Sequence, residues 1–252
     1  MHRLIIVLLL LGGCSSSVVH QQSSKHTSNT LDVLLVSDHT LPHHLNKGSG
    51  GANGEERLYI DPTLARLSLL FSSKGLMVRT INVEDFAPDK TILDDETFNT
   101  AYATYDKVLK QAVSDDVTII SVHYDANFLY DENDPTIVTY TGGAQIILDE
   151  RAVSESTLTL ANNLIFEHKL LESLNQTGLR IRPDYDDEIR YQSNLTLNIV
   201  GHSDGGALLL EIGAQDQAVE LFGTPENIVK AIEKPLNILV DGVIAHRAKL
   251  DF

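Results

Sequence analysis

Four short runs of almost continuous apolar residues constrain the fold of this chain more than any other feature. They lie at residues 32–37 (DVLLVS), 117–122 (VTIISV), 144–148 (AQIIL) and 207–212 (ALLLEI). A strand with one solvated face alternates apolar and polar residues, whereas a strand covered on both faces is apolar throughout. The runs therefore predict a buried, mostly parallel or mixed sheet with helices on both faces.

Amphipathic segments separate these runs and complete the predicted fold. We expect the first helix to begin at Asp61-Pro62, as N-cap and first helical residue, and to end at Gly75. We predict further helices and strands by the same periodicities: helices over about 97–113, 154–174 and from Thr224-Pro225 with a kink at Pro235, and strands at 76–81 and 195–200. The sequence thus indicates an α/β class protein, a single-domain three-layer sandwich over residues 31–252.

The first thirty residues have a different character. Leu4–Leu11 is an apolar run that spans about 12 Å as a helix, far less than the roughly 30 Å of a bilayer core, so residues 1–13 are typical of a signal peptide. Leu11-Gly12-Gly13-Cys14 resembles the lipobox of bacterial lipoproteins, which implies a lipidated Cys14. Residues 14–30 are rich in serine, and we expect them to form a flexible tether with a reach of roughly 20–25 Å.

Charge and cysteine content limit the kinds of partner and cross-link that this chain can have. With 19 Lys+Arg against 35 Asp+Glu the formal charge is −16, which excludes binding to nucleic acid or anionic lipid through a basic surface. The single cysteine excludes an internal disulfide. Membrane attachment is therefore expected through acyl chains on Cys14, and Ser15 after it favours the outer membrane, facing the periplasm.

Polar residues follow several of the predicted strands. His39 and His123 come at the ends of two of them, Glu211 near the end of another, and Glu55 and Glu56 lie in the loop after the first. Ligands of α/β sheets bind at the carboxyl ends of the strands, where these side chains would meet. Two histidines and a carboxylate form an open zinc site, and a second carboxylate can serve as general base.

These segments resemble, in order, the zinc-dependent N-acetylmuramoyl-L-alanine amidases of the type called Amidase_3. The most specific motifs are Ser121-Val122-His123-Tyr124-Asp125-Ala126-Asn127 and the apolar strand that ends in Glu211-Ile212-Gly213. The resemblance implies that His39, Glu56 and His123 bind Zn²⁺ and that Glu211 is the catalytic base. It also implies hydrolysis of the amide bond between the lactyl group of N-acetylmuramic acid and L-alanine in peptidoglycan.

The chain also departs from the family pattern. Ser37-Asp38-His39-Thr40 stands where the family has Gly-His-Gly-Gly, and His43 and His44 follow closely enough to compete for a metal. Glu56 matches the family register better than Glu55, which remains an alternative ligand. The altered first motif leaves open a non-catalytic amidase-fold lipoprotein with a binding or regulatory role, and another zinc peptidase or amidohydrolase is the third interpretation. An activator protein is not identifiable from the sequence.

Three further features have competing interpretations. Gly201-His202-Ser203-Asp204-Gly205 matches a nucleophile elbow with Asp241 and His246 downstream, but a turn between two strands fits it better, with His202 and Asp204 as possible substrate contacts. His168 lies on an apolar helix face and is expected in the core. The acidic stretches at 94–96, 131–134 and 184–188 lack EF-hand spacing, so we expect solvated loops.

Overall fold

The apolar runs form the central strands of one six-stranded sheet. A computed structural model describes residues 31–39, 50–51, 54–125, 128–130, 138–140, 142–182, 189–194 and 196–250. The strands of the sheet, in spatial order, are β4 (Val78–Asn82), β1 (Val33–Ser37), β5 (Thr118–Asp125), β10 (Ala207–Ala214), β8 (Gln145–Asp149) and β9 (Ile189–Gln192). All neighbours are parallel except β10 and β8. The predicted mixed, mostly parallel sheet is confirmed.

Two short hairpin-like pairs lie outside this sheet. They are formed by β2 (Gly50–Gly51) with β3 (Gly54–Glu55), and by β6 (Phe128–Tyr130) with β7 (Val138–Tyr140). The α-helices are α1 (Arg57–Ser73), α2 (Asp95–Ser114), α3 (Glu155–Asn162), α4 (Leu170–Gln176), α5 (Leu197–Val200), α6 (Gln215–Phe222), α7 (Pro225–Ala231) and α8 (Glu233–Leu250). In the described part of the chain, the 3₁₀-helices η1 (Val83–Phe86) and η2 (Pro88–Lys90) follow β4, and the short π-helix η3 (Asn163–Glu167) follows α3.

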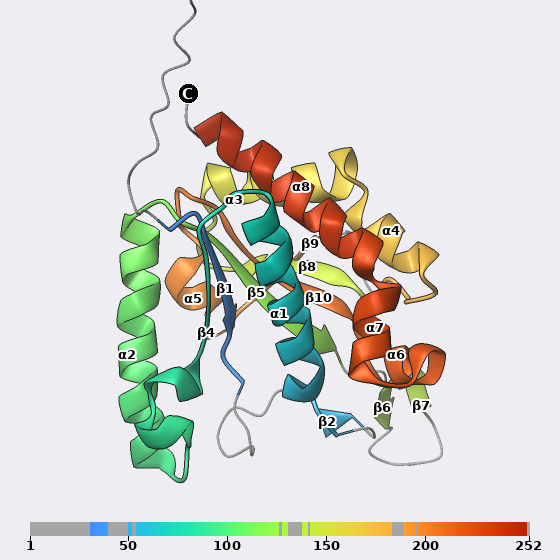
Figure 1. The fold of residues 1–252 in the computed structure, drawn as a ribbon, viewed down its shortest axis with the longest axis horizontal. Coiled ribbons are helices and arrows are strands. Elements are labelled where there is room, and N and C mark those ends of the chain that lie inside the picture. Colours follow the sequence, from blue (N-terminus) through green and yellow to red (C-terminus); the bar gives the residue numbers. More distant parts are fainter. Residues whose placement is uncertain are drawn as a thin grey trace, which may run out of the picture.

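Alternate residues of β1 pack into two different hydrophobic cores. In β1, Val33 and Leu35 belong to the core under α1, α3, α4 and α8, whereas Leu34 and Val36 belong to the core under α2. Figure 1 shows α1 and α8 in front of the sheet and α2 at its left side. Because both faces of β1 are covered, every residue of the strand is buried, which explains its lack of alternation. The predicted three-layer arrangement is confirmed.

The strand predicted at 195–200 is wrong, because residues 197–200 form the short helix α5. The Asn194 side-chain oxygen accepts hydrogen bonds from the backbone N–H of Thr196 and Leu197, at 2.9 and 3.2 Å. This side chain starts a helical turn, in the manner of an Asx cap. Leu197 and Val200 are then buried three residues apart, a spacing that suits one helical face as well as it suits an apolar run.

The predicted start of the first helix is wrong by about one turn. Helix α1 begins at Arg57, directly after Glu56, and Pro62 lies inside it. Asp61 does not cap the helix: its carboxylate accepts hydrogen bonds from the Arg57 guanidinium one turn earlier, at 2.9 and 3.1 Å. The helix therefore reaches back to Glu56 and fixes the position of that residue.

The remaining helix boundaries follow their sequence signals closely. Ser154 caps α3 through a 3.0 Å bond from the Thr157 N–H, although the predicted helix over 154–174 is interrupted by η3. Thr224 caps α7, Pro225 is its first residue, and the predicted interruption occurs at Ile232, three residues before Pro235. None of the helices in the described part of the chain is long and apolar enough to cross a bilayer.

The Gly201–Gly205 segment is a tight turn at the amino-terminal end of β10. A Cβ atom on Gly205 would lie 2.4 Å from the carbonyl oxygens of Asp116 and Val117, and one on Gly201 would lie 2.6 Å from the Asp149 Cβ. The two glycines of this motif are thus required for close packing of backbone segments.

We expect Gly205→Ala to destabilise the protein by about 3 kcal/mol, because the two carbonyls that its Cβ meets belong to the backbone and cannot move aside cheaply. The matched control is Gly75→Ala, where φ is +87° but no atom lies within 4 Å of the added Cβ. That change should cost only about 1 kcal/mol, from the left-handed conformation alone. Urea unfolding of both variants measures the difference, and equal losses would contradict the packing explanation.

Candidate metal centre

Two histidines and a glutamate from three segments meet at the carboxyl edge of the sheet. His39 is the second residue after β1, His123 lies in β5, and Glu56 immediately precedes α1. Val36 of β1 pairs with Ser121 of the parallel strand β5, so the segments that follow these residues run side by side. His39, His123 and Glu56 are 8%, 3% and 2% exposed, respectively, so all three are almost out of solvent.

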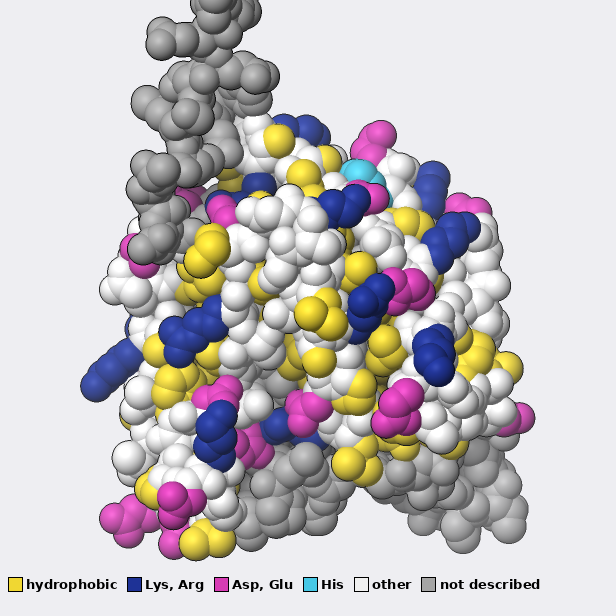
Figure 2. Space-filling model, viewed as in Figure 1, with side chains coloured by type: hydrophobic (Ala, Val, Ile, Leu, Met, Phe, Trp, Pro, Cys, Tyr) yellow, Lys and Arg dark blue, Asp and Glu magenta, His cyan; other side chains and the backbone are white. Residues whose placement is uncertain are grey.

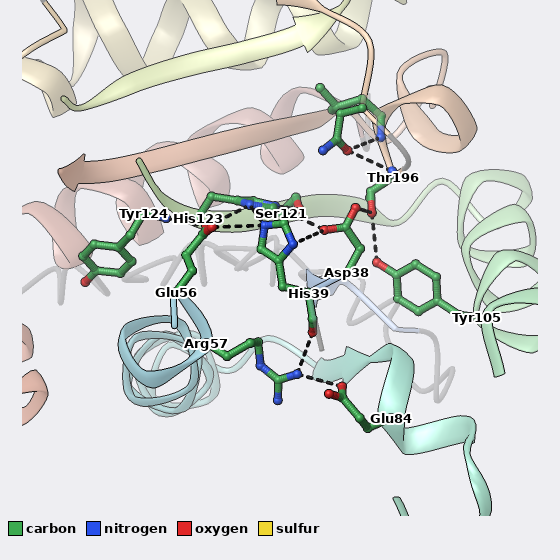
Figure 3. Close-up of polar contacts among 12 residues, drawn as sticks. Asp38, His39, Glu56, Arg57, Glu84, Tyr105, Ser121, His123, Tyr124 and Thr196 are labelled. Carbon is green, nitrogen blue, oxygen red and sulfur yellow. Dashed lines mark hydrogen bonds and ion pairs between the residues drawn. The ribbon is translucent and has the colours of Figure 1, made fainter. Parts of the chain in front are cut away.

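The three side chains converge (Figure 3), with one ring nitrogen from each histidine and both carboxylate oxygens of Glu56 close together. His39 Nε2 lies 2.9 Å from His123 Nδ1 and 3.2 Å from Glu56 Oε2, and His123 Nδ1 lies 3.1 Å from Glu56 Oε1. Four zinc ligands at about 2.0–2.1 Å in a tetrahedron are separated from one another by about 3.3 Å. The donor set and its spacing therefore fit a zinc ion with one open coordination position.

Glu56 carries its negative charge readily in this environment. Burial by itself would raise the pKa of the Glu56 carboxyl, but hydrogen bonds and charge from His123 and His39 hold that pKa well below its usual range. The Tyr124 N–H also donates a 2.9 Å hydrogen bond to Glu56 Oε1. The carboxylate form is thus available to a cation near neutral pH.

The structure brings Glu56 to both histidines. The side chain of Glu55 lies outside the described residues, as do His43 and His44, so their competition for a metal stays untested. Cys14 and the rest of residues 1–30 also lie outside them.

A second group of polar side chains lies on the far side of the two imidazole rings. Asp38 Oδ1 is 3.7 Å from His39 Nδ1 and 3.8 Å from His123 Nε2, and Ser121 Oγ is 2.9 Å from His123 Nε2. Asp38, His39 and His123 offer ligand atoms that all lie within 4.8 Å of one another. This spacing is wider than that of the Glu56 set, which favours the Glu56 side as the position of an ion.

Arg57 connects this centre to the neighbouring elements. Its guanidinium donates to the His39 carbonyl oxygen and to Glu84 in η1, both at 2.7 Å. Arg57 and Glu84 are 5% exposed each, so the ion pair is buried and weakly screened. Arg57, which follows the candidate ligand Glu56, thereby fixes the backbone of the candidate ligand His39.

Glu211 lies beside His123 on the next strand. The two residues are paired in the register of β10 and β5, so their side chains emerge on the same face of the sheet. Burial, followed by the negative charges of Glu56 and Asp125, raises the pKa of Glu211 well above its usual value, against the opposing effect of Arg182 and Arg190. A raised pKa makes the ionised carboxylate a stronger base, which favours proton transfer from a water molecule.

Gln145 is the residue of β8 that pairs with Glu211 on its other side. It is 4% exposed, and neither its amide nitrogen nor its amide oxygen has a hydrogen-bond partner among the residues that the structure describes. The same holds for Glu211 Oε2. Facing residues of an antiparallel pair have Cβ atoms about 4.5–5.5 Å apart, so three unmet polar atoms gather here. Such atoms cost stability unless a ligand or water satisfies them.

Sequence reasoning missed Asp38, Ser121 and Gln145 as members of this site. Ser121 carries a local signal, since residues two apart in a strand share one face and Ser121 precedes His123 by two. Asp38 is adjacent to His39, but its approach to His123 depends on the pairing of β1 with β5. Gln145 becomes a neighbour of Glu211 only through the antiparallel pairing of β8 with β10.

The nucleophile-elbow interpretation of Ser203 has no geometric support. Ser203 is fully buried and its hydroxyl accepts a 3.2 Å bond from the Gly205 N–H, whereas His246 Nε2 lies near Ser156 and the Gly205 carbonyl. Asp241 forms an ion pair with Lys74 instead. The predicted turn is confirmed, although it follows helix α5 rather than a strand.

The possible substrate contacts of His202 and Asp204 are wrong for a related reason. Their turn precedes β10, whereas Glu211 comes near the carboxyl end of that strand, so turn and site lie at opposite edges of the sheet. His168, expected in the core, is only half-buried, although its ring lies close to Gly242, where an added Cβ would approach it to 3.4 Å. The loop expected at 94–96 is wrong, because Asp94 caps α2 with a 2.8 Å bond from the Thr97 N–H and Asp95 and Glu96 lie in the first turn of that helix. Residues 131–134 and 184–188 lie outside the described residues.

The surface around α1 and α8 carries mixed charge. Figure 2 shows acidic and basic side chains interspersed over this face. Lys74 of α1 pairs with Asp241 of α8 at 3.0 Å, and Arg66 pairs with Glu233 between the same helices. Much of the positive charge seen here is therefore matched locally.

No family model and no curated protein matches the chain by sequence. Solved structures match it by fold. The N-acetylmuramyl-L-alanine amidase Ami1 from Mycobacterium smegmatis superposes with a TM-score of 0.55 at 13% identity, covering 87% of this chain and 100% of that one. The apo form of Ami1 from Mycobacterium abscessus gives 0.54 at 16% identity, covering 86% and 99%.

A third similar structure is the CwlD amidase from Clostridioides difficile, solved in complex with the GerS lipoprotein. It gives a TM-score of 0.52 at 14% identity and covers 85% of this chain and 98% of that one. At these identities the likeness concerns the fold. The fold of this chain is thus that of the N-acetylmuramoyl-L-alanine amidases, as the resemblance in its motifs predicts.

Proposed function

We propose that this protein is a zinc-dependent amidase of peptidoglycan, which hydrolyses the amide bond between the lactyl group of N-acetylmuramic acid and the L-alanine of the stem peptide. The observation that carries the proposal is the convergence of His39, Glu56 and His123, whose candidate ligand atoms lie 2.9–3.2 Å apart. The convergence occurs at the carboxyl edge of the sheet, in a fold that known amidases share.

The residues around this point have separate roles in the proposed reaction. His39, Glu56 and His123 would hold a zinc ion, which would supply a Lewis acid for the scissile carbonyl and lower the pKa of a nearby water molecule. Glu211 removes the proton from the attacking water as the new C–O bond forms. Its carboxyl, whose pKa is raised by burial, then delivers that proton to the leaving amine nitrogen as the C–N bond breaks. The products are the glycan and a stem peptide with a free N-terminal alanine.

The sequence of the first fourteen residues supports attachment of this domain to the cell envelope. We propose that Cys14 is acylated after removal of residues 1–13, which places the enzyme on a lipid anchor with a mature formal charge of −16 − 1 = −17 once Arg3 is lost. In cells that grow with a labelled fatty acid, the protein should become labelled and fractionate with membranes. Cys14→Ser should remove both properties, and labelling that survives this change contradicts the proposal.

The substrate assignment predicts a defined product from purified muropeptides. The wild-type chain loaded with zinc should release peptides that begin with alanine, as mass spectrometry of the mixture would show. Glu211→Gln should still bind zinc but lose about 10²–10⁴-fold in rate, because it removes the general base. His123→Ala should lose the zinc itself, which elemental analysis of the purified protein measures.

Other outcomes of this experiment point to the alternative functions. Cleavage within the stem peptide would identify a zinc peptidase. A wild-type protein that binds no zinc and releases no product would support a non-catalytic binding or regulatory module. An active Glu211→Gln variant would remove Glu211 from the role of base.

The unmet polar atoms of Gln145 and Glu211 predict a contact with the amide groups of the substrate. Gln145→Leu keeps the side-chain size but cannot form hydrogen bonds, so kcat/KM should fall about tenfold, while the free energy of unfolding should rise by about 1 kcal/mol because a buried unmet amide is removed. Kinetics with muropeptides and urea unfolding measure the two effects. Gln192→Leu, at the opposite end of the sheet in β9, is the matched control and should leave kcat/KM unchanged. A Gln145→Leu variant that is destabilised, or fully active, contradicts this role.

A further inference from the structure

Asp38 faces the two histidines from the side opposite to Glu56. It is 1% exposed, and its Oδ1 atom lies 3.7 Å from His39 Nδ1 and 3.8 Å from His123 Nε2. The remaining nitrogens, His39 Nε2 and His123 Nδ1, are those near Glu56. Each imidazole therefore has one nitrogen toward each carboxylate, and the pair of rings lies between two buried acids (Figure 3).

A chain of buried hydroxyl groups holds Asp38 in this position. Thr196 Oγ1 donates a 3.1 Å hydrogen bond to Asp38 Oδ2 and lies 3.0 Å from the Tyr105 hydroxyl. A threonine hydroxyl has one hydrogen, so Tyr105 donates to Thr196 when Thr196 donates to Asp38. Thr196 and Tyr105 are fully buried, and Asn194 fixes the Thr196 backbone N–H at 2.9 Å. The orientation of Asp38 is thus set from α2 and from the start of α5.

We infer that Asp38 is a positioning residue that prepares His39 and His123 to bind a metal ion on the Glu56 side. A neutral imidazole carries one N–H, and a nearby carboxylate, which only accepts, favours that N–H on the nitrogen facing it. The lone pairs of His39 Nε2 and His123 Nδ1 are then left toward Glu56. The inference rests on the proposed zinc site and concerns what this chain adds to it.

Asp38 acts on the rings through charge rather than through a short hydrogen bond. At 3.7 and 3.8 Å its distances to the ring nitrogens exceed hydrogen-bond length, but a charge in a buried site is weakly screened. Ser121 supplies the short contact to His123 Nε2 at 2.9 Å. Two carboxylates, Asp38 and Glu56, also balance the charge of one divalent cation.

The test is the zinc affinity of the full chain, measured by competition with a chromophoric chelator. Asp38→Asn keeps an acceptor for Thr196 and nearly the same shape, and should weaken zinc binding by 10–100-fold, the usual effect of such an outer partner. Glu56→Gln should weaken it further, because a direct ligand is lost. Asp106→Asn, which removes an acid paired with Lys110 on the exposed side of α2, is the control and should leave the affinity unchanged.

A second variant and a stability measurement separate this role from a structural one. Thermal unfolding of the metal-free Asp38→Asn protein should occur at or above the wild-type temperature, since a buried charge is removed. Thr196→Val leaves the carboxylate but removes its donor, and should weaken zinc binding several-fold. If Asp38→Asn does not fold, the Thr196→Val variant tests the positioning role of Asp38 by itself. Unchanged zinc affinity in Thr196→Val would then overturn the inference.

The remaining outcomes also discriminate. Wild-type affinity in a folded Asp38→Asn protein overturns the inference alone and leaves the proposed function intact. A larger loss in Asp38→Asn than in Glu56→Gln overturns it too, by placing the ion on the Asp38 side. A wild-type chain that binds no zinc overturns the inference together with the proposed function.

Discussion

The parallel pairing of β1, β5 and β10 is the constraint on which the candidate site depends. Val36 opposite Ser121, and Glu211 opposite His123, bring the ends of three strands that are distant in sequence to one edge of the sheet. Apolar side chains on both faces stabilise these strands, so their ends are held by burial that the site itself does not provide. A register shift of one residue would turn His123 or Glu211 to the other face of the sheet. The same strand register is therefore needed for the site and for the packing of the core.

The second constraint is electrostatic. Two acids and two histidines share a volume from which solvent is nearly excluded, and a third acid, Glu211, lies on the adjacent strand. The pKa of the Glu56 carboxyl is held low by the histidines, whereas that of Glu211 is raised by burial and by the charge on Glu56. The environment thus separates a carboxylate suited to a cation from a carboxyl suited to carrying a proton.

The sequence was sufficient for the parts of the structure that local pattern determines. The central strands followed from unbroken apolar runs, and the cap at Thr224 from its side chain and the following proline. The strand predicted at 195–200 is wrong because Leu197 and Val200 suit a strand and a helical face equally. The Asn194 side chain, which bonds the first backbone N–H groups of the turn, favours the helix. The helix start predicted at Asp61-Pro62 is wrong because the same residue pair also occurs inside a helix. The contact of Asp61 with Arg57, one turn earlier, cannot be read from the local sequence pattern. Asp38 and Gln145 depend on strand pairing, which no local pattern encodes.

The position of Asp38 bears on whether the altered histidine motif reflects loss of a metal site. Where the family pattern has a small, uncharged glycine, this chain buries a carboxylate 1% exposed beside two imidazoles and a second carboxylate. Burying like charges costs several kcal/mol unless opposite charge compensates, and apolar side chains of similar volume would give a more stable fold. A chain that only retained the fold as a scaffold gains nothing from this arrangement. The divalent cation proposed above would add positive charge between the histidines and Glu56, close to both carboxylates, so the departure at Asp38 fits the proposed metal site better than the loss of one.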